Sequence, residues 1–145
     1  MTSLVQATSL AKSYVDGPRV VRVLRDLDLT LAAGERVAVV GASGIGKSTL
    51  LHVLGTLDVP DSGRFIFDGV DVFGQSEAAL ATFRNREIGF VFQFHQLLPD
   101  FTAVENVMFP GLLGRVSFAA ARRRATDLLE RVGLGERLDH RPGEL

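Results

Sequence analysis

Residues Gly41 to Ser48 have the types and the spacing that bind phosphate groups, because they fit the pattern G-x-x-x-x-G-K-[ST] at every fixed position. Glycines adopt backbone angles that are closed to other residues, so successive N–H groups can point at phosphate oxygens. In this pattern Lys47 reaches the β- and γ-phosphates, and the Ser48 hydroxyl ligates Mg²⁺. The sequence therefore predicts a nucleotide-phosphate site rather than a glycine-rich turn that only joins two elements.

The residues on either side of this loop are those that would position it. Val37 to Val40 are apolar and predict a short buried strand that runs directly into the loop. Leu50, Val53 and Leu54 are spaced for one face of a helix that Gly55 ends, and its positive N-terminal end lies near Lys47. The residues predicted to bind the nucleotide here are Gly41, Ala42, Ser43, Gly44, Ile45, Gly46, Lys47, Ser48 and Thr49.

Length and composition restrict the other possibilities. With 145 residues, 46% hydrophobic and 23% charged, the chain has the size and balance of one ordinary globular domain. The net charge of −1 gives no support for a nucleic-acid-binding surface, so no nucleic-acid partner is expected. No segment reads as a secretion signal or as a membrane span. A membrane connection would therefore come through a partner protein.

The part before and after the loop predicts an antiparallel β layer. Residues 4–10 and 20–24 read as strands, and residues 26–31 alternate between leucine and polar side chains, as a half-buried antiparallel strand does. A further strand over 64–68 turns tightly at Asp68-Gly69.

The remaining part alternates helices with one more strand. Ser76 is expected to cap a helix over 76–86, and residues 88–92 form a continuous apolar run typical of a buried parallel strand. Thr102 to Glu105 fit a capping box that opens a helix, which Pro110 is expected to kink or end near Phe109. Ser117 is expected to cap a last helix over 118–132.

Three separated stretches together resemble the ATP-binding subunit of ABC transporters: KSYVDGPRVVRVLRDLDLTLAAGE, GASGIGKSTLLHVLGTLDVPDSG and GFVFQFHQLLPDFTAVENV. The resemblance implies an α/β fold, with a RecA-like P-loop NTPase core, an antiparallel β subdomain and the start of an inserted helical subdomain. On this basis residues 1–145 are the N-terminal part of one nucleotide-binding domain. Residues 1–93 form the β subdomain and P-loop core, and residues 94–145 form the Q-loop and partial helical subdomain.

The resemblance gives roles to residues outside the phosphate loop. Tyr14 matches the aromatic residue that stacks on adenine, although a tyrosine at a strand end can also be merely structural. Gln93 matches the glutamine that approaches Mg²⁺ and the attacking water, so Lys47 and Gln93 are the implied catalytic residues and Ser48 and Gln93 the metal ligands. The apolar residues within 94–101 either pack as a small local core or contact the transmembrane subunits, and both alternatives stay open.

Function follows from the same resemblance. ATP with Mg²⁺ would be the ligands, the full-length protein would be a homodimeric ATPase, and it would lie on the cytoplasmic face of the bacterial inner membrane. The segment QFHQLLPDF is similar to the branch that powers lipoprotein release, while relatives in macrolide export and cell division carry similar segments.

The chain ends at Leu145, just where the family continues into its serine-glycine-glycine signature. The chain is accordingly expected to be C-terminally incomplete and, alone, to bind ATP without hydrolysing it, because the family's catalytic carboxylate follows later. One rival interpretation is a soluble phosphate-loop kinase or GTPase, which is disfavoured because no N-K-x-D follows the loop. The others are a soluble ABC protein acting on DNA or ribosomes, and a non-catalytic binding fragment.

Overall fold

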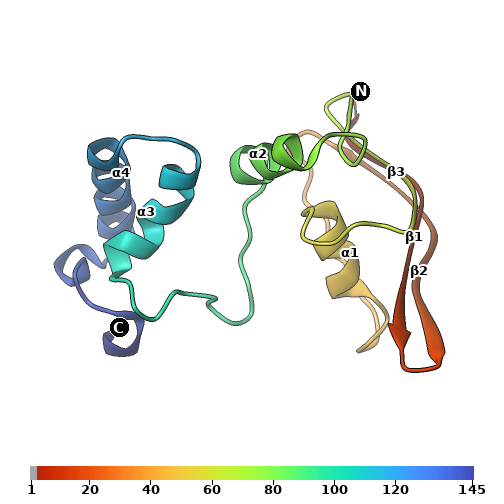
Figure 1. Cartoon of the computed structure of the whole chain (residues 1–145), viewed down its shortest axis with the longest axis horizontal. Helices are drawn as coiled ribbons and strands as arrows, with labels where there is room; N and C mark the ends of the chain where they lie inside the picture. The colour runs from red at the N-terminus through yellow and green to blue at the C-terminus, as the bar shows by residue number, and fades with distance from the viewer. Residues whose placement is uncertain (1–2) are drawn as a thin grey trace. The chain divides into compact units, whose positions relative to one another are not determined.

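The computed structural model describes residues 3–145, and the chain divides into two compact units (Figure 1). The first unit ends at Arg84 and the second begins at Asn85, and each has its own hydrophobic core. The helix α2 (Glu77–Glu87) contains this boundary. Each unit is described separately below.

The first unit is built on one antiparallel sheet with the strand order β2-β1-β3-β4. Its strands are β1 (Ser3–Asp16), β2 (Arg19–Ala32), β3 (Ser62–Phe67) and β4 (Val70–Asp71). The strands β1 and β2 form a long hairpin, which Figure 1 shows in red and orange. The predicted antiparallel layer is confirmed, and the segments 20–24 and 26–31 are parts of the single strand β2.

The helix α1 (Lys47–Leu54) follows the phosphate loop and packs on this sheet. Its Leu50 and Val53 are buried, and Gly55 caps its C-terminus, as the sequence predicts. The sheet contributes the buried residues Ala7, Leu10, Leu24 and Phe65 to the same core. The helix α1 begins at Lys47, the lysine of the loop. The burial of the apolar face of α1 therefore fixes the position of the Lys47 backbone.

Two of the strands expected from apolar runs are absent from the described part of the chain. Residues 37–40 and 88–92 are both irregular, and Val40 and Val91 are 86% and 102% exposed. A buried parallel strand requires hydrogen-bonded strands on its sides, and within residues 3–145 neither segment has such a partner. The prediction of a buried strand at each of these two segments, from their apolar composition alone, was therefore wrong.

The second unit consists of α3 (Ala103–Leu113) and α4 (Phe118–Arg131), followed by short 3-10 helices at Gly135–Arg137 and Pro142–Glu144. The two long helices lie side by side in Figure 1 and bury a core of Ala103, Val104, Met108, Ala121, Ala125 and Leu129. Both predicted caps are confirmed: Thr102 forms a capping box with Glu105, and the Ser117 hydroxyl accepts from the N–H of Ala120.

Of the two alternatives for Pro110, a kink or an end of the helix near Phe109, the end is wrong, because α3 continues to Leu113. A proline inside a helix removes one backbone hydrogen bond and costs about 3 kcal/mol when nothing compensates. Here Met108 is buried against α4, and the turn after the proline is hydrogen bonded through Gly114 N–H to Pro110 O at 3.0 Å. Tertiary packing therefore outweighs the local preference.

Candidate nucleotide-binding site

The phosphate loop is a tight turn that ends on the first residue of α1. Gly44 and Gly46 have φ angles of 76° and 107°, in the left-handed region that favours glycine. Gly46 is the N-cap of α1, and no side chain caps the first turn of this helix. The predicted use of glycine is thus confirmed at these two positions.

The backbone N–H groups of the loop are the donors that such a site requires. Within residues 3–145, only one N–H of the loop donates to a backbone carbonyl, from Ile45 to Ala42 at 3.4 Å. The N–H groups of Ser43, Gly44, Gly46, Lys47 and Ser48 make no hydrogen bond to the described part of the chain. Free amides at a helix N-terminus attract anions, so the donor set fits a phosphate chain.

The side chain of Lys47 folds back across the loop. Its Nζ donates to the carbonyls of Gly41 at 3.0 Å and Ala42 at 2.7 Å. These two bonds hold the ammonium group over the same turn that carries the free N–H groups. A positive charge and several amide donors are therefore brought together at the start of α1.

Gly46 is required for a second reason, which is its closeness to β2. A Cβ atom at this position would lie 2.6 Å from Val23 Cγ1 and 3.3 Å from the Val23 carbonyl oxygen. Gly44, in contrast, has no atom within 4 Å of such a Cβ. The loop is thus braced against β2 at Gly46, while its middle is open.

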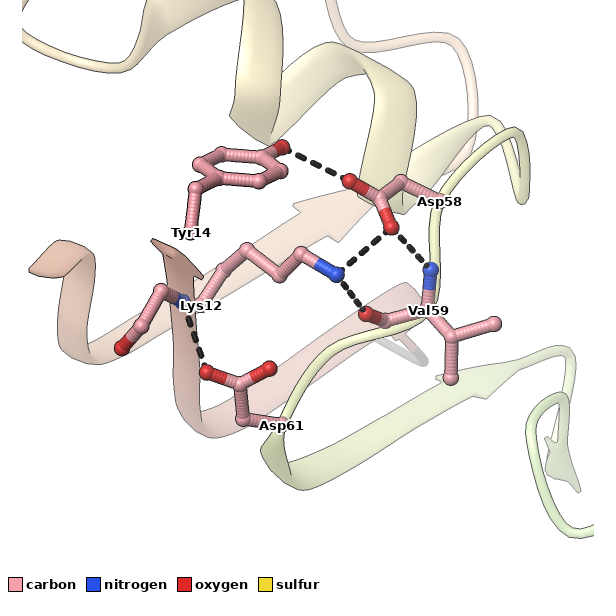
Figure 2. A network of polar contacts seen from close by, with 6 residues as sticks. Lys12, Tyr14, Asp58, Val59 and Asp61 are labelled. Atoms are coloured by element: carbon pink, nitrogen blue, oxygen red, sulfur yellow. Dashed lines mark hydrogen bonds and ion pairs between the residues drawn. The ribbon is translucent and has the colours of Figure 1, made fainter. Parts of the chain in front are cut away.

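Tyr14 lies near the C-terminal end of β1, within a network of polar contacts (Figure 2). Its hydroxyl donates to Asp58 Oδ2 at 2.7 Å, and Lys12 Nζ donates to Asp58 Oδ1 at 2.6 Å and to the Val59 carbonyl at 2.7 Å. The Lys12 ammonium also lies 5.2 Å from the centroid of the Tyr14 ring. The backbone of Ser13 donates to Asp61 Oδ2 at 2.6 Å, which ties the same stretch of β1 to the segment after α1.

The charges in this network stabilise one another. The hydrogen bond to Asp58 raises the pKa of Lys12 and, together with partial burial, the pKa of Tyr14. Burial raises the pKa of the Asp58 carboxyl, but the hydrogen bonds from Lys12 and Tyr14 outweigh it and leave that pKa lowered. The Thr49 hydroxyl opposes part of the rise in the pKa of Tyr14. The structure joins Tyr14, through Asp58, to the segment that follows α1.

Gln93 belongs to the second unit, where its side chain is exposed in the irregular segment before α3. In the segment 94–101 that follows, Phe94 is 75% exposed, whereas the Phe101 ring packs edge-on against Phe109 with centroids 5.5 Å apart. The Asn106 amide donates to the carbonyls of Leu98 at 3.1 Å and Phe101 at 3.0 Å, and its Oδ1 accepts from Leu98 N–H at 2.8 Å. The segment 94–101 thus contains both an aromatic ring that packs on α3 and apolar side chains that are exposed.

No pattern in the sequence indicates Asp58 or Asn106. The neighbours of Asp58 are typical of a loop, and its partner Tyr14 is 44 positions away along the chain. Asn106 lies within a helix, where its repeated bonds to the preceding segment follow from the fold and not from a motif. Long-range polar contacts of this kind have no local pattern.

Comparison with known proteins agrees with this geometry. The family model described as "ABC transporter" matches residues 24–145. The ATP-binding cassette MJ0796, solved as a dimer in a post-hydrolysis state bound to ADP and Pi, superposes with a TM-score of 0.87 and 33% identity over 97% of this chain and 62% of that one. The fold is therefore that of a P-loop NTPase of the α/β class, with an antiparallel β subdomain and the start of a helical subdomain. The chain belongs to the ABC transporter family.

Within the ABC transporter family, the chain is similar to one kind of ATP-binding protein. The lipoprotein-releasing system ATP-binding protein LolD of Syntrophotalea carbinolica is 56% identical over 143 residues, which are 99% of this chain and 63% of the relative. LolD of Geobacter metallireducens is 57% identical over 145 residues, or 100% of this chain and 64% of the relative. The chain thus spans slightly less than two thirds of the length of these relatives.

No helix formed by residues 3–145 has the length and apolar character to cross a bilayer.

Proposed function

We propose that this chain is the nucleotide-binding part of an ABC transporter ATPase of the LolD type, which binds ATP at the phosphate loop. The observation that carries the proposal is the convergence of unbonded loop N–H groups and the Lys47 ammonium at the start of α1. Such donors hold the β- and γ-phosphates, and the fixed helix places positive charge at the same point. The domain would extend over the whole chain, with residues 1–93 as β subdomain and P-loop core and residues 94–145 as Q-loop and partial helical subdomain.

Each predicted residue has a separate role in this proposal. The Ser48 hydroxyl and the Gln93 amide would hold Mg²⁺, which when bound neutralises phosphate charge. The Tyr14 ring would support the adenine, because an exposed aromatic face stacks on any base. Gln93 would also orient a water molecule through its amide oxygen. The loop amides and Lys47 bind the phosphates themselves.

The test is titration of the chain with ATP, compared with the variant Lys47→Ala. A hydrogen bond to a charged group contributes about 1.5–3 kcal/mol, so the variant should bind ATP about ten- to a hundredfold more weakly. Arg64→Ala is a matched control, since it removes another cation of the first unit, one that forms an ion pair with Asp71 at 3.3 Å. Equal affinity of the wild type and Lys47→Ala would rule out the assignment of this site.

Hydrolysis is expected to be negligible for residues 1–145 alone. Three acidic side chains of the first unit are engaged elsewhere: Asp58 by Lys12 and Tyr14, Asp61 by the N–H of Ser13, and Asp71 by Arg64. Phosphoryl transfer to water requires a group that positions the water and groups that stabilise charge. Phosphate release measured on the same preparation decides this point.

The relatives' role in lipoprotein release extends the proposal to partners. The exposed apolar residues of the segment 94–101 would contact transmembrane subunits at the cytoplasmic face of the inner membrane, and two copies would pair around ATP. Co-purification with membrane subunits that carry lipoprotein supports this role. Co-purification with ribosomes or DNA would favour a soluble ABC protein instead.

A further inference from the structure

We propose that Asp58 is a positioning residue for nucleotide binding, which holds the Tyr14 ring by its hydroxyl at a fixed place relative to the phosphate loop. The inference rests on the function proposed above and assigns it a residue outside the phosphate loop. Both carboxylate oxygens of Asp58 are used: Oδ2 accepts from Tyr14, and Oδ1 accepts from Lys12 and from the N–H of Val59 at 2.8 Å. Figure 2 shows the phenol and the ammonium converging on this one carboxylate.

Apolar packing does little to fix the Tyr14 ring. Tyr14 lies two residues before the end of β1, opposite Val21 of β2. Around it Val15 is 78% exposed, Val20 64% and Val21 48%, so this end of the hairpin has no apolar core. An exposed side chain at such a place populates several rotamers unless a specific bond selects one. For Tyr14, the hydrogen bond to Asp58 selects one rotamer.

Asp58 is itself attached firmly to α1. The N–H groups of Leu57 and Asp58 both donate to the His52 carbonyl, at 2.8 and 3.2 Å. Between them and the helix lies Thr56, which is 1% exposed and whose carbonyl accepts from the Arg84 guanidinium. The carboxylate therefore moves with α1, and α1 begins at Lys47. The tether joins the ring to the same rigid helix that carries the phosphate site.

Lys12 determines which face of the ring is available. Its ammonium lies 5.2 Å from the ring centroid while it is bonded to Asp58, so it covers one face of Tyr14. A base then stacks on the opposite face. Asp58 thus fixes both the position of the ring and the side on which the adenine binds.

The tether can be measured without nucleotide, because Tyr14 is the only tyrosine and the chain has no tryptophan. The ultraviolet absorbance of tyrosinate therefore reports the ionisation of this one phenol. Asp58→Ala should lower the pKa of Tyr14 toward its ordinary value, since the bond to Asp58 is the largest cause of its rise. Asp71→Ala is the matched control, because within residues 3–145 the Asp71 carboxylate bonds only Arg64 and the N–H of Gly74, and the pKa of the phenol should stay unchanged.

The functional test is a double-mutant cycle of Asp58→Ala and Tyr14→Phe, with ATP and tripolyphosphate as the two probes. Ordering one side chain at a binding site changes affinity by roughly two- to tenfold, so each single variant should bind ATP more weakly by this factor. Tripolyphosphate, which has no base, should bind all variants alike. The double variant should be no weaker than either single one, because both remove the same hydrogen bond. Asp58→Asn should restore ATP binding, because the phenol can donate to or accept from an amide.

Several results would overturn the inference. If Asp58→Ala weakens the binding of ATP and of tripolyphosphate equally, the substitution has a general effect on the loop, and thermal unfolding of each variant identifies such a case. Additive losses in the double variant, or an unchanged pKa of Tyr14 in Asp58→Ala, would show that Asp58 does not act through the phenol. Failure of the wild type to bind either probe, or no effect of Lys47→Ala, refutes the proposed function instead.

Discussion

Replacing Gly46 by alanine should destabilise the first unit more than replacing Gly44 of the same loop by alanine. Two effects add at this position. A non-glycine residue held at a φ of 107° costs about 1–3 kcal/mol in backbone strain. The new Cβ would also lie 2.6 Å from Val23 Cγ1, and overpacking of this kind costs about 1–3 kcal/mol. Val23 is β-branched and has few rotamers with which to withdraw. The free energy of unfolding should therefore fall by about 2–6 kcal/mol.

The chain offers a control for each of the two effects. Gly44→Ala places a residue at a φ of 76° with no atom within 4 Å, so it should carry the strain alone, about 1–3 kcal/mol. Val23→Ala removes the clashing methyl group, so Gly46→Ala should cost less in that background than in the wild type. Denaturant unfolding of the four variants and the wild type gives all the required differences.

Two outcomes would refute this reasoning. If Gly44→Ala and Gly46→Ala cost the same, the contact with Val23 is not a constraint on the loop. If Val23→Ala recovers none of the loss at Gly46, the cost arises from backbone strain alone. In either case β2 does not brace the start of α1.

Two further predictions concern the second unit. Asn106→Ala should free the segment that its amide holds at Leu98 and Phe101, lowering the stability of this unit by about 1–3 kcal/mol, and unchanged hydrogen exchange at the Leu98 N–H would contradict this. The backbone N–H of Thr102, then its hydroxyl, lowers the pKa of Glu105 from its ordinary value of 4.5. The stabilisation from Glu105 is therefore present above that ordinary pKa and lost as the pH falls through the lower folded-state pKa. Denaturation over a pH series should show this dependence weakened in Glu105→Gln, and identical profiles would exclude it.

Local chemistry was predictable from the sequence wherever neighbouring residues determine it. The phosphate loop, the capping box at Thr102 and the tight turn at Asp68-Gly69 all depend on residues a few positions apart, and the structure confirms each as an element. Their patterns record backbone angles and hydrogen bonds that close within one turn. Such features depend little on the residues elsewhere in the chain.

Features that need distant partners could not be predicted in the same way. The apolar runs at 37–40 and 88–92 have the composition of buried strands, but a strand is formed only where a neighbour supplies its hydrogen bonds. Pro110 is the opposite case, because a proline locally favours the end of a helix. Here the packing of Met108 against α4 stabilises α3 beyond the proline. The link between Tyr14 and Asp58 joins residues 44 positions apart, and no spacing rule indicates it.

The two ends of α1 explain why these long-range contacts matter for the site. At its start, Gly46 lies against Val23 of β2, and beyond its end Asp58 holds Lys12 and Tyr14 of β1. The helix has 8 residues and is thus about 12 Å long, so the hairpin is joined to a short rigid rod at both ends. A change at either end shifts the phosphate donors relative to the ring. The distance between the two parts of the candidate site is therefore set by the packing of α1 on the hairpin and not by the loop motif itself.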